Sequence, residues 1–450
     1  MLIWFTTLSV ASAHEVMPAI ADLRAEEGTV TVSVRASIES FVAGVDLSRV
    51  SDTNESAQAA LYDALRALPP ETLSVRFASF WPEMAERITL RAGETDLDLT
   101  LQSVSVDPVG NPELVRFSLF EFTAPLPEGA HTLQFGWAPE YGALVLRQMD
   151  VPAPFDAFLD NGSITDPFPL AGGGETSGVE TFLDYIPVGF DHIVPKGLDH
   201  ILFVLGLFFL AARFRPLLIQ VSLFTVAHTI TLALAALGYT RGIEMWFADT
   251  LGVAFIDVVE PLIALSIAYV AIENIFMKGI SPWRPLVIFI FGLLHGLGFA
   301  SVLAEFGLPD ATFVAALIGF NVGVELGQLA VIAVMFFFVW QALRVDRGEN
   351  EVVQSLWVYA VFFVAGAGVL WAFGQEVAAV LSYPLAVLDV PAVLFGVSMC
   401  VMAVLCLFSV LLRDTVDAYR RFVAVPASVV VAAIGLYWFI QRSYGTISGI

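Results

Sequence analysis

Long apolar segments separated by short polar turns fill the chain from about residue 197 to its end. About 20 apolar residues in a row are enough for a helix to cross the hydrocarbon core of a bilayer. The pattern therefore predicts an α-helical polytopic membrane domain of about seven or eight transmembrane helices, with the lower number if the short first segment does not cross fully. The expected spans are 197–212, 217–239, 256–276, 285–304, 312–341, 353–373, 391–412 and 422–441.

The first third of the chain follows a different pattern, because apolar and polar residues alternate over short runs bounded by turn residues. The clearest runs are Thr29–Val34, Leu73–Phe77 and Leu97–Leu101, with hairpin-length segments at 114–122 and 132–148. They predict an N-terminal all-β ectodomain, an antiparallel sandwich. One helix is expected near 55–68, where Asn54 can serve as its N-cap.

Composition also differs between the predicted ectodomain and the predicted membrane domain. Mean hydropathy is +0.78 and 57% of the residues are hydrophobic, values too high for a soluble enzyme. Residues 14–178 hold 25 of the 44 acidic residues but only 9 of the 21 basic ones. An acidic ectodomain argues against nucleic acid or anionic lipid as its partner, and it is consistent with the local attraction of cations.

These patterns predict five regions along the chain. Residues 1–13 end in Ala11-Ser12-Ala13 and are interpreted as a signal peptide, with an uncleaved anchor as the alternative. The other regions are a periplasmic ectodomain over 14–160, a glycine-rich linker over 161–187, a membrane core over 188–341 and additional transmembrane helices over 342–450. Both cysteines, Cys400 and Cys406, lie in an apolar helix, so no disulfide is expected in the exported domain.

Basic residues orient the helices, because Lys and Arg accumulate in cytoplasmic turns. With the N-terminal module outside, the first two inner turns carry Arg213 with Arg215 and Lys278 with Arg284. The later basic turns, with Arg344 and Arg347 and then with Arg413 to Arg421, do not alternate cleanly in this scheme. The expected location is an inner membrane, with the N-terminal domain in the periplasm.

A short internal repeat relates two of these helices. Arg215-Pro216-Leu217 opens the helix that carries His228, and Arg284-Pro285-Leu286 opens the one that carries His295. Proline is tolerated in a first helical turn. Parallel repeats of this kind would place the two histidines at comparable depths, although chance similarity is an equal alternative.

Ionisable side chains within or beside the apolar segments carry the functional signal. Each costs roughly 2.5–3.5 kcal/mol on insertion scales, so several in separate helices are expected to face one another. They are His192, Asp199, His200, His228, Glu260, Glu273, His295 and Glu325. Imidazole together with carboxylate suits nickel, cobalt, zinc and copper(II), so the set predicts an intramembrane metal site.

Several of these positions also have a structural alternative. Asp199 can cap a helix while His192 lies in the headgroup zone, and Glu273 can pair with Lys278 or Arg284. His295 and Glu325 can form a buried structural hydrogen-bond pair instead of a functional one. Glu260 lies about one turn in from the outer helix end and is a candidate pathway residue.

Polar and small residues accompany these groups at helical spacing. Thr225 lies on the helix face of His228, and the amides of Asn321 and Gln328 flank Glu325, where they can orient a ligand. The alternative for them is hydrogen bonding that joins helices. Glycines are spaced for close helix packing at 292/296 and at 319/323/327.

Five strings in this order resemble the HupE/UreJ family of bacterial membrane proteins. They are His192–Phe203, Phe224–Leu232, Val259–Ser266, Phe291–Ser301 and Phe320–Gln328. The resemblance covers about residues 188–330 and implies a permease or accessory protein for nickel, linked to hydrogenase and urease maturation. Matched to the family, the implied metal contacts are His192, Asp199, His200, His228, His295 and Glu325. The chain differs from the family's short forms in its ectodomain, its extra helices and the insertion of Pro195-Lys196.

Two further histidines lie outside the membrane segments. Cleavage after Ala13 would expose His14, whose amine and imidazole could chelate copper near Met17, whereas a frayed polar residue is the alternative. His131 is isolated on an expected strand and is interpreted as structural.

Three functions agree with these patterns. The first is a transporter for a divalent transition-metal ion, coupled to protons through Glu325 or Glu273. The second is a non-transporting assembly or accessory protein, whose ectodomain binds a periplasmic protein. An intramembrane enzyme is the least favoured, because the chain has no HExxH motif and no serine with an evident base. The expected partners are therefore a metal ion, the lipid bilayer and a periplasmic protein.

Overall fold

The computed structural model describes residues 18–26, 28–50, 53, 56–110, 115–173, 177–251, 255–277, 279–306, 312–349, 352–373 and 391–448. The predicted signal peptide, His14 and Asn54 lie outside this part of the chain. The chain divides into two compact units. One comprises Met1–Asp184 with Val302–Leu317, and the other comprises Tyr185–Ser301 with Ile318–Ile450.

Two β-sheets form most of the first unit. The larger sheet has the order β5-β6-β2-β1-β8-β9 and the smaller has the order β10-β7-β3-β4. The strands of the larger sheet are β1 (Ala19–Glu26), β2 (Thr29–Ala36), β5 (Thr100–Val106), β6 (Ser118–Pro125), β8 (Leu144–Gln148) and β9 (Asp156–Leu159). Those of the smaller are β3 (Thr89–Ala92), β4 (Thr95–Asp96), β7 (Thr132–Gly136) and β10 (Phe168–Pro169).

A shared core joins the two sheets. Val32 and Phe120 from the larger sheet and Leu90 and Phe135 from the smaller belong to one buried cluster. The predicted sandwich-like domain is therefore confirmed. The expectation of purely antiparallel pairing is wrong at one place, since β1 pairs with β8 in parallel.

Three helices accompany the sheets, and one of them replaces a predicted strand. They are α1 (Ile38–Ala43), α2 (Ala59–Arg66) and α3 (Pro70–Ala85), with a short 3-10 turn, η2 (Pro139–Tyr141). Helix α2 lies within the predicted 55–68 helix, whereas the strand predicted over 73–77 is wrong because α3 covers it. The buried residues Leu73, Phe77, Trp81 and Met84 recur every three or four positions, which is a helical period.

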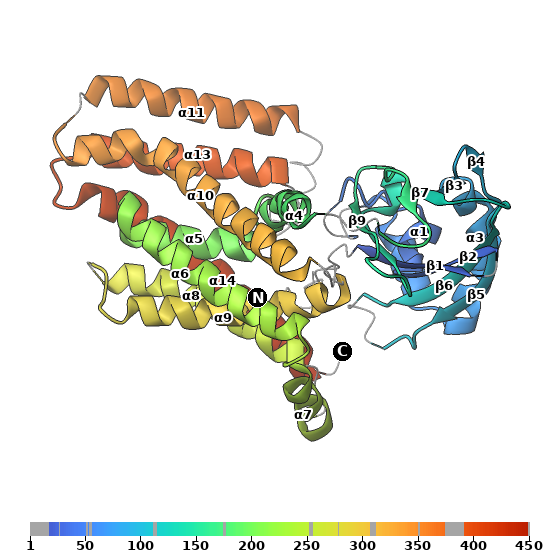
Figure 1. Cartoon of the computed structure of the whole chain (residues 1–450). Coiled ribbons are helices and arrows are strands. Elements are labelled where there is room, and N and C mark those ends of the chain that lie inside the picture. Colours follow the sequence, from blue (N-terminus) through green and yellow to red (C-terminus); the bar gives the residue numbers. More distant parts are fainter. Residues whose placement is uncertain are drawn as a thin grey trace. The chain divides into compact units, whose positions relative to one another are not determined.

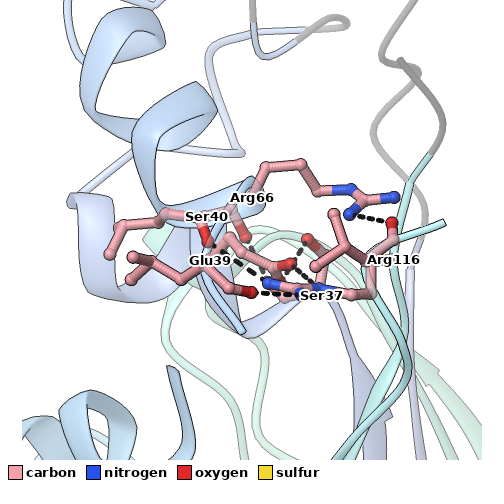
Figure 2. Close-up of polar contacts among 8 residues, drawn as sticks. Ser37, Glu39, Ser40, Arg66 and Arg116 are labelled. Atoms are coloured by element: carbon pink, nitrogen blue, oxygen red, sulfur yellow. Dashed lines mark hydrogen bonds and ion pairs between the residues drawn. The ribbon is translucent and has the colours of Figure 1, made fainter. Parts of the chain in front are cut away.

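A buried ion pair ties α1 to the loops beside it (Figure 2). The side chains of Glu39 and Arg116 are 0% and 1% exposed, and Arg116 Nε donates to Glu39 Oε1 at 2.7 Å. Arg116 also donates to the carbonyl oxygens of Leu68 and Leu65 at 2.8 and 3.2 Å. A buried charge is tolerated when it is paired and hydrogen-bonded, so the cluster is structural.

The second unit is helical. Its elements, with the starts of α4 and α10 reaching into the first unit, are α4 (Gly178–Ile193), α5 (Leu198–Leu210), α6 (Phe214–Ala236), α7 (Arg241–Leu251), α8 (Phe255–Phe276), α9 (Arg284–Phe306), α10 (Phe313–Asp346), α11 (Val352–Ala372), α13 (Pro391–Leu411), η4 (Arg420–Ala424) and α14 (Val425–Ser448). In Figure 1, α8 lies along α14 and α11 lies along α13. Helix α4 begins inside the segment expected to be a linker.

Every predicted span corresponds to a helix. Among the described residues, six helices are long and apolar enough to cross a membrane, and the bent pair α4 and α5 makes a seventh. Helix α9 contributes a shorter apolar segment, Arg284–Gly298, at the position of the remaining predicted span. The prediction of a polytopic helical domain is confirmed.

The basic turns gather at one end of the helices. Arg420 donates to the carbonyl oxygens of Ile275 and Met277 at the end of α8, at 3.0 and 3.1 Å. The N–H of Tyr419 donates to Asp346 Oδ1 at the end of α10, at 3.2 Å. Arg284, at the start of α9, donates to Gln220 Oε1 near the start of α6, at 2.9 Å.

Four turns therefore share that end, namely α5–α6, α8–α9, α10–α11 and α13–α14. The expectation that the later basic turns fail to alternate is wrong. The fifth and seventh of eight spans finish on the same side as the first and third, so all four turns agree with one orientation.

Candidate metal centre

The bend between α4 and α5 brings two histidines together. The two helix axes differ by 75° across residues 194–197. Gly197 permits the bend, because a Cβ there would lie 2.3 Å from the carbonyl oxygen of His192. The His192 ring at the end of α4 consequently lies 4.9 Å from the His200 ring in the first turn of α5.

Helix α6 adds a third histidine to this pair. The His228 ring lies 6.1 Å from that of His192 and 5.5 Å from that of His200. One ring nitrogen from each of the three lies within 4.8 Å of the others, and His200 and His228 are 2% and 0% exposed. We call His192, His200 and His228 the three-histidine group. Three helices thus converge on a buried point that can hold a metal ion.

His295 of α9 extends the group on one side. Its ring lies 5.1 Å from that of His200, and the residue is 1% exposed. Its Nδ1 pairs with the carbonyl oxygen of Phe291 at 2.9 Å. Since a carbonyl can only accept, Nδ1 carries the proton and Nε2 keeps its lone pair.

A hydrogen bond also determines which ring nitrogen of His228 carries the proton. Its Nδ1 lies 3.2 Å from Asn321 Oδ1 on α10, so with this amide orientation Nδ1 donates and Nε2 carries the lone pair. The Nε2 atoms of His228 and His295 and the Nδ1 atom of His200 are buried without a hydrogen-bond partner among the described residues. A neutral imidazole held through its other nitrogen is the form that binds metals.

Asp199 lies in the first turn of α5, directly before His200. Its Oδ1 accepts the backbone N–H of His200 at 2.8 Å. The N-cap residue of α5 is Gly197, so the expectation that Asp199 itself caps the helix is wrong. The carboxylate instead satisfies an N–H of the first turn, at the helix end that carries the site.

Two more polar pairs connect α6 to α10. Thr225 Oγ1 donates to Gln328 Oε1 at 3.3 Å, and Ser222 Oγ donates to Glu325 Oε1 at 2.6 Å. Glu325 Oε2 is buried and has no hydrogen-bond partner within the described part of the chain. Ser222 precedes His228 by six residues on α6, which is a rise of about 9 Å along the helix axis. Glu325, which Ser222 contacts, therefore lies nearer the basic end than His228 does.

The other two predicted carboxylates lie with arginines instead. Glu273 Oε2 forms an ion pair of 2.5 Å with Arg284 Nη1, and the two side chains are 14% and 1% exposed. The Glu260 side chain is 47% exposed and lies 3.9 Å from Arg442. Neither glutamate belongs to the three-histidine group.

Close glycine contacts hold the helices that carry the site. On α9, a Cβ at Gly296 would lie 2.6 Å from the carbonyl oxygen of His228. On α10, a Cβ at Gly323 would lie 2.0 Å from the carbonyl oxygen of Ile186, and Gly189 of α4 is equally tight against Phe320. The sequence pattern indicated Gly292, Gly296, Gly323 and Gly327 but not Gly189, which lacks a matching small residue four positions away.

Phenylalanines enclose the imidazoles and were missed from the sequence. The Phe224 ring lies 5.0 Å from His295 and 5.6 Å from His200, and Phe320 lies 5.5 Å from His192. A usable signal was present, since Phe224 and Phe291 each precede a helix histidine by four residues. Apolar rings therefore border the imidazoles.

A comparison with protein families matches this part of the chain. Residues 173–375 match the family model described as HupE / UreJ protein. No curated protein matches the chain. The matched range includes His192, the buried His200, His228 and His295, and Glu325.

Proposed function

We propose that this protein is a permease for a divalent transition-metal ion, because residues 173–375 match the model of the HupE/UreJ family, which is linked to nickel and cobalt handling. The ion passes through the three-histidine group. Nickel is the favoured substrate, and cobalt, zinc and copper(II) suit the same ligands.

One observation carries the proposal, namely the convergence of three imidazoles from α4, α5 and α6 within 4.8 Å. Burying a polar atom without a partner is costly. His200 Nδ1 and His228 Nε2 are buried without a hydrogen-bond partner among the described residues, and a cation that they bind together explains them best. The charge of Asp199 favours that cation further.

His200 gives the ion a way to move. It neighbours His192 on one side and His295 on the other, with ring separations of 4.9 and 5.1 Å. An ion that exchanges His192 for His295 keeps His200 as a ligand throughout. Transfer by ligand exchange avoids a fully uncoordinated ion in the membrane.

Glu325 is the next acceptor toward the basic end. Its unpartnered Oε2 can receive either the ion or a proton, and Ser222 holds the other oxygen. We assign proton coupling to Glu325 rather than to Glu273, because Arg284 already neutralises Glu273. With the basic end in the cytoplasm, the ion enters from the periplasmic side.

Metal accumulation in cells that express the chain tests the proposal. His200→Ala and His228→Ala are expected to abolish the accumulation of nickel above the empty-vector level, and Glu325→Gln to reduce it. His131→Ala is the matched control, because His131 is exposed in the β-rich domain and should leave accumulation unchanged. Membrane levels of each variant are measured in parallel.

The competing function, a non-transporting accessory protein, gives a different result. Unchanged accumulation of nickel, cobalt, zinc and copper in the His200→Ala variant would contradict the permease. His200→Gln, which retains the side-chain volume, distinguishes loss of a ligand from a packing defect.

A further inference from the structure

A cavity lies at the basic end of α10, far along the helix from the histidines. It has a volume of about 290 Å³. Its lining residues are Phe336, Trp340, Leu343, Arg344, Arg347 and Glu349. The apolar lining residues come from the last turns of the apolar part of α10. The two lining arginines follow them at the end of the helix.

Backbone hydrogen bonds close the helix end that carries these arginines. Gly348, at φ +73°, donates its N–H to the carbonyl oxygen of Val345, and Glu349 donates its N–H to that of Arg344 at 2.8 Å. This pair of bonds is the Schellman motif, which satisfies carbonyl groups at the helix terminus. The motif leaves the guanidinium groups largely free for a ligand.

Arg344 and Arg347 are three residues apart, so they lie on one face of the helix. The guanidinium of Arg344 lies 5.5 Å from the ring centre of Trp340 and donates to the carbonyl oxygen of Glu349 at 3.4 Å. Neither arginine has a carboxylate partner within the described residues. Glu349 is the one acidic lining residue, so the cavity carries a net charge of about +1.

The surroundings identify the ligand class. The bond from Tyr419 to Asp346 places the end of α10 among the basic turns, and Trp340 is 54% exposed. Exposed tryptophan beside arginine is typical of the interface between hydrocarbon and headgroups. Arginine pairs recognise phosphate oxygens, and basic pockets beside membrane helices bind anionic lipid headgroups.

We propose that this cavity binds an anionic phospholipid. The phosphate lies between Arg344 and Arg347, and the first part of an acyl chain lies along Trp340 and Phe336. The site is independent of metal transport.

Quenching of tryptophan fluorescence by brominated lipid tests the proposal with the full-length chain in vesicles. Trp340→Phe identifies the share of the quenching that comes from Trp340. For that share, brominated phosphatidylglycerol is expected to bind more tightly than brominated phosphatidylcholine, by about fivefold for each arginine. Arg344→Gln with Arg347→Gln is expected to remove the preference, and the double lysine variant to retain most of it.

A matched pair of substitutions separates a site from general surface charge. Arg213→Gln with Arg215→Gln removes two charges from the same end without touching the cavity lining, and it should leave the preference intact. Equal quenching by both lipids in the unmodified chain would overturn the proposal, as would equal loss in the two double variants. Displacement of the lipid by inorganic phosphate would also overturn it, because it would indicate a site for the free anion.

Discussion

Asn321 shows how a neutral amide can determine what a histidine does. Its Oδ1 accepts a hydrogen bond from the Nδ1–H of His228, which leaves Nε2 of that ring available to a metal ion. We expect Asn321→Leu to weaken nickel binding by about 10- to 100-fold, since the ring loses its orienting partner. Titration calorimetry on the purified chain measures this effect.

The conservative change gives the control for this prediction. Asn321→Asp keeps an oxygen acceptor at the same place, so it is expected to retain binding close to that of the unmodified chain. Equal weakening in both variants would contradict an orienting role and indicate a packing defect.

Single residues differed in how well the sequence predicted their place. All four membrane-associated histidines were expected to meet, because buried imidazoles have few other partners, and the structure brings them within ring separations of 4.9 to 6.1 Å in a connected series. The carboxylates were less predictable. For Glu273 the sequence left two alternatives open, and its pairing with Arg284 is the one that the structure shows. The approach of Arg442 to Glu260 was not expected, because the two residues are far apart in the sequence.

Helix α9 offers a direct test of how the helices hold the site. Gly296→Ala would push a methyl group against the carbonyl oxygen of His228 and Thr231 Oγ1, at 2.6 and 2.1 Å before any shift. We expect α6 to move and nickel affinity to fall at least about tenfold, since misplaced ligands lose binding steeply. Equilibrium dialysis with nickel provides the measurement.

Gly368→Ala is the matched control within a membrane helix, because a Cβ at Gly368 meets nothing within 4 Å. It should bind nickel as the unmodified chain does. Comparable loss in both variants would mean that glycine content, and not the α6–α9 contact, determines affinity.

Helices and strands were predicted correctly where one sequence pattern was long enough to identify them. The membrane helices followed from the length of their apolar segments, as α8 and α10 illustrate. Helix α3 was mistaken for a strand because Leu73–Phe77 alternates over five residues, too short a window to separate the two periods. The α4–α5 bend was also not foreseen, since it depends on a close backbone approach at Gly197.

The whole molecule has an orientation that the gathered basic turns predict. Gly279 lies exposed in the α8–α9 turn, and Ser163 lies exposed in the β-rich domain. In a chain with Cys400→Ala and Cys406→Ala, we expect a membrane-impermeant maleimide to label Ser163→Cys in spheroplasts. Gly279→Cys should be labelled only after the membrane is inverted. Labelling of Gly279→Cys in spheroplasts would contradict the orientation.

Nickel binding to the purified full-length chain shows whether imidazoles from separate helices hold one metal ion. We expect one bound ion per chain, lost when His192, His200 and His228 are all changed to alanine and retained in His131→Ala. X-ray absorption of the bound ion should show a shell of imidazole nitrogens. Equal binding by the triple variant, or a shell of oxygen ligands alone, would rule out a shared histidine site.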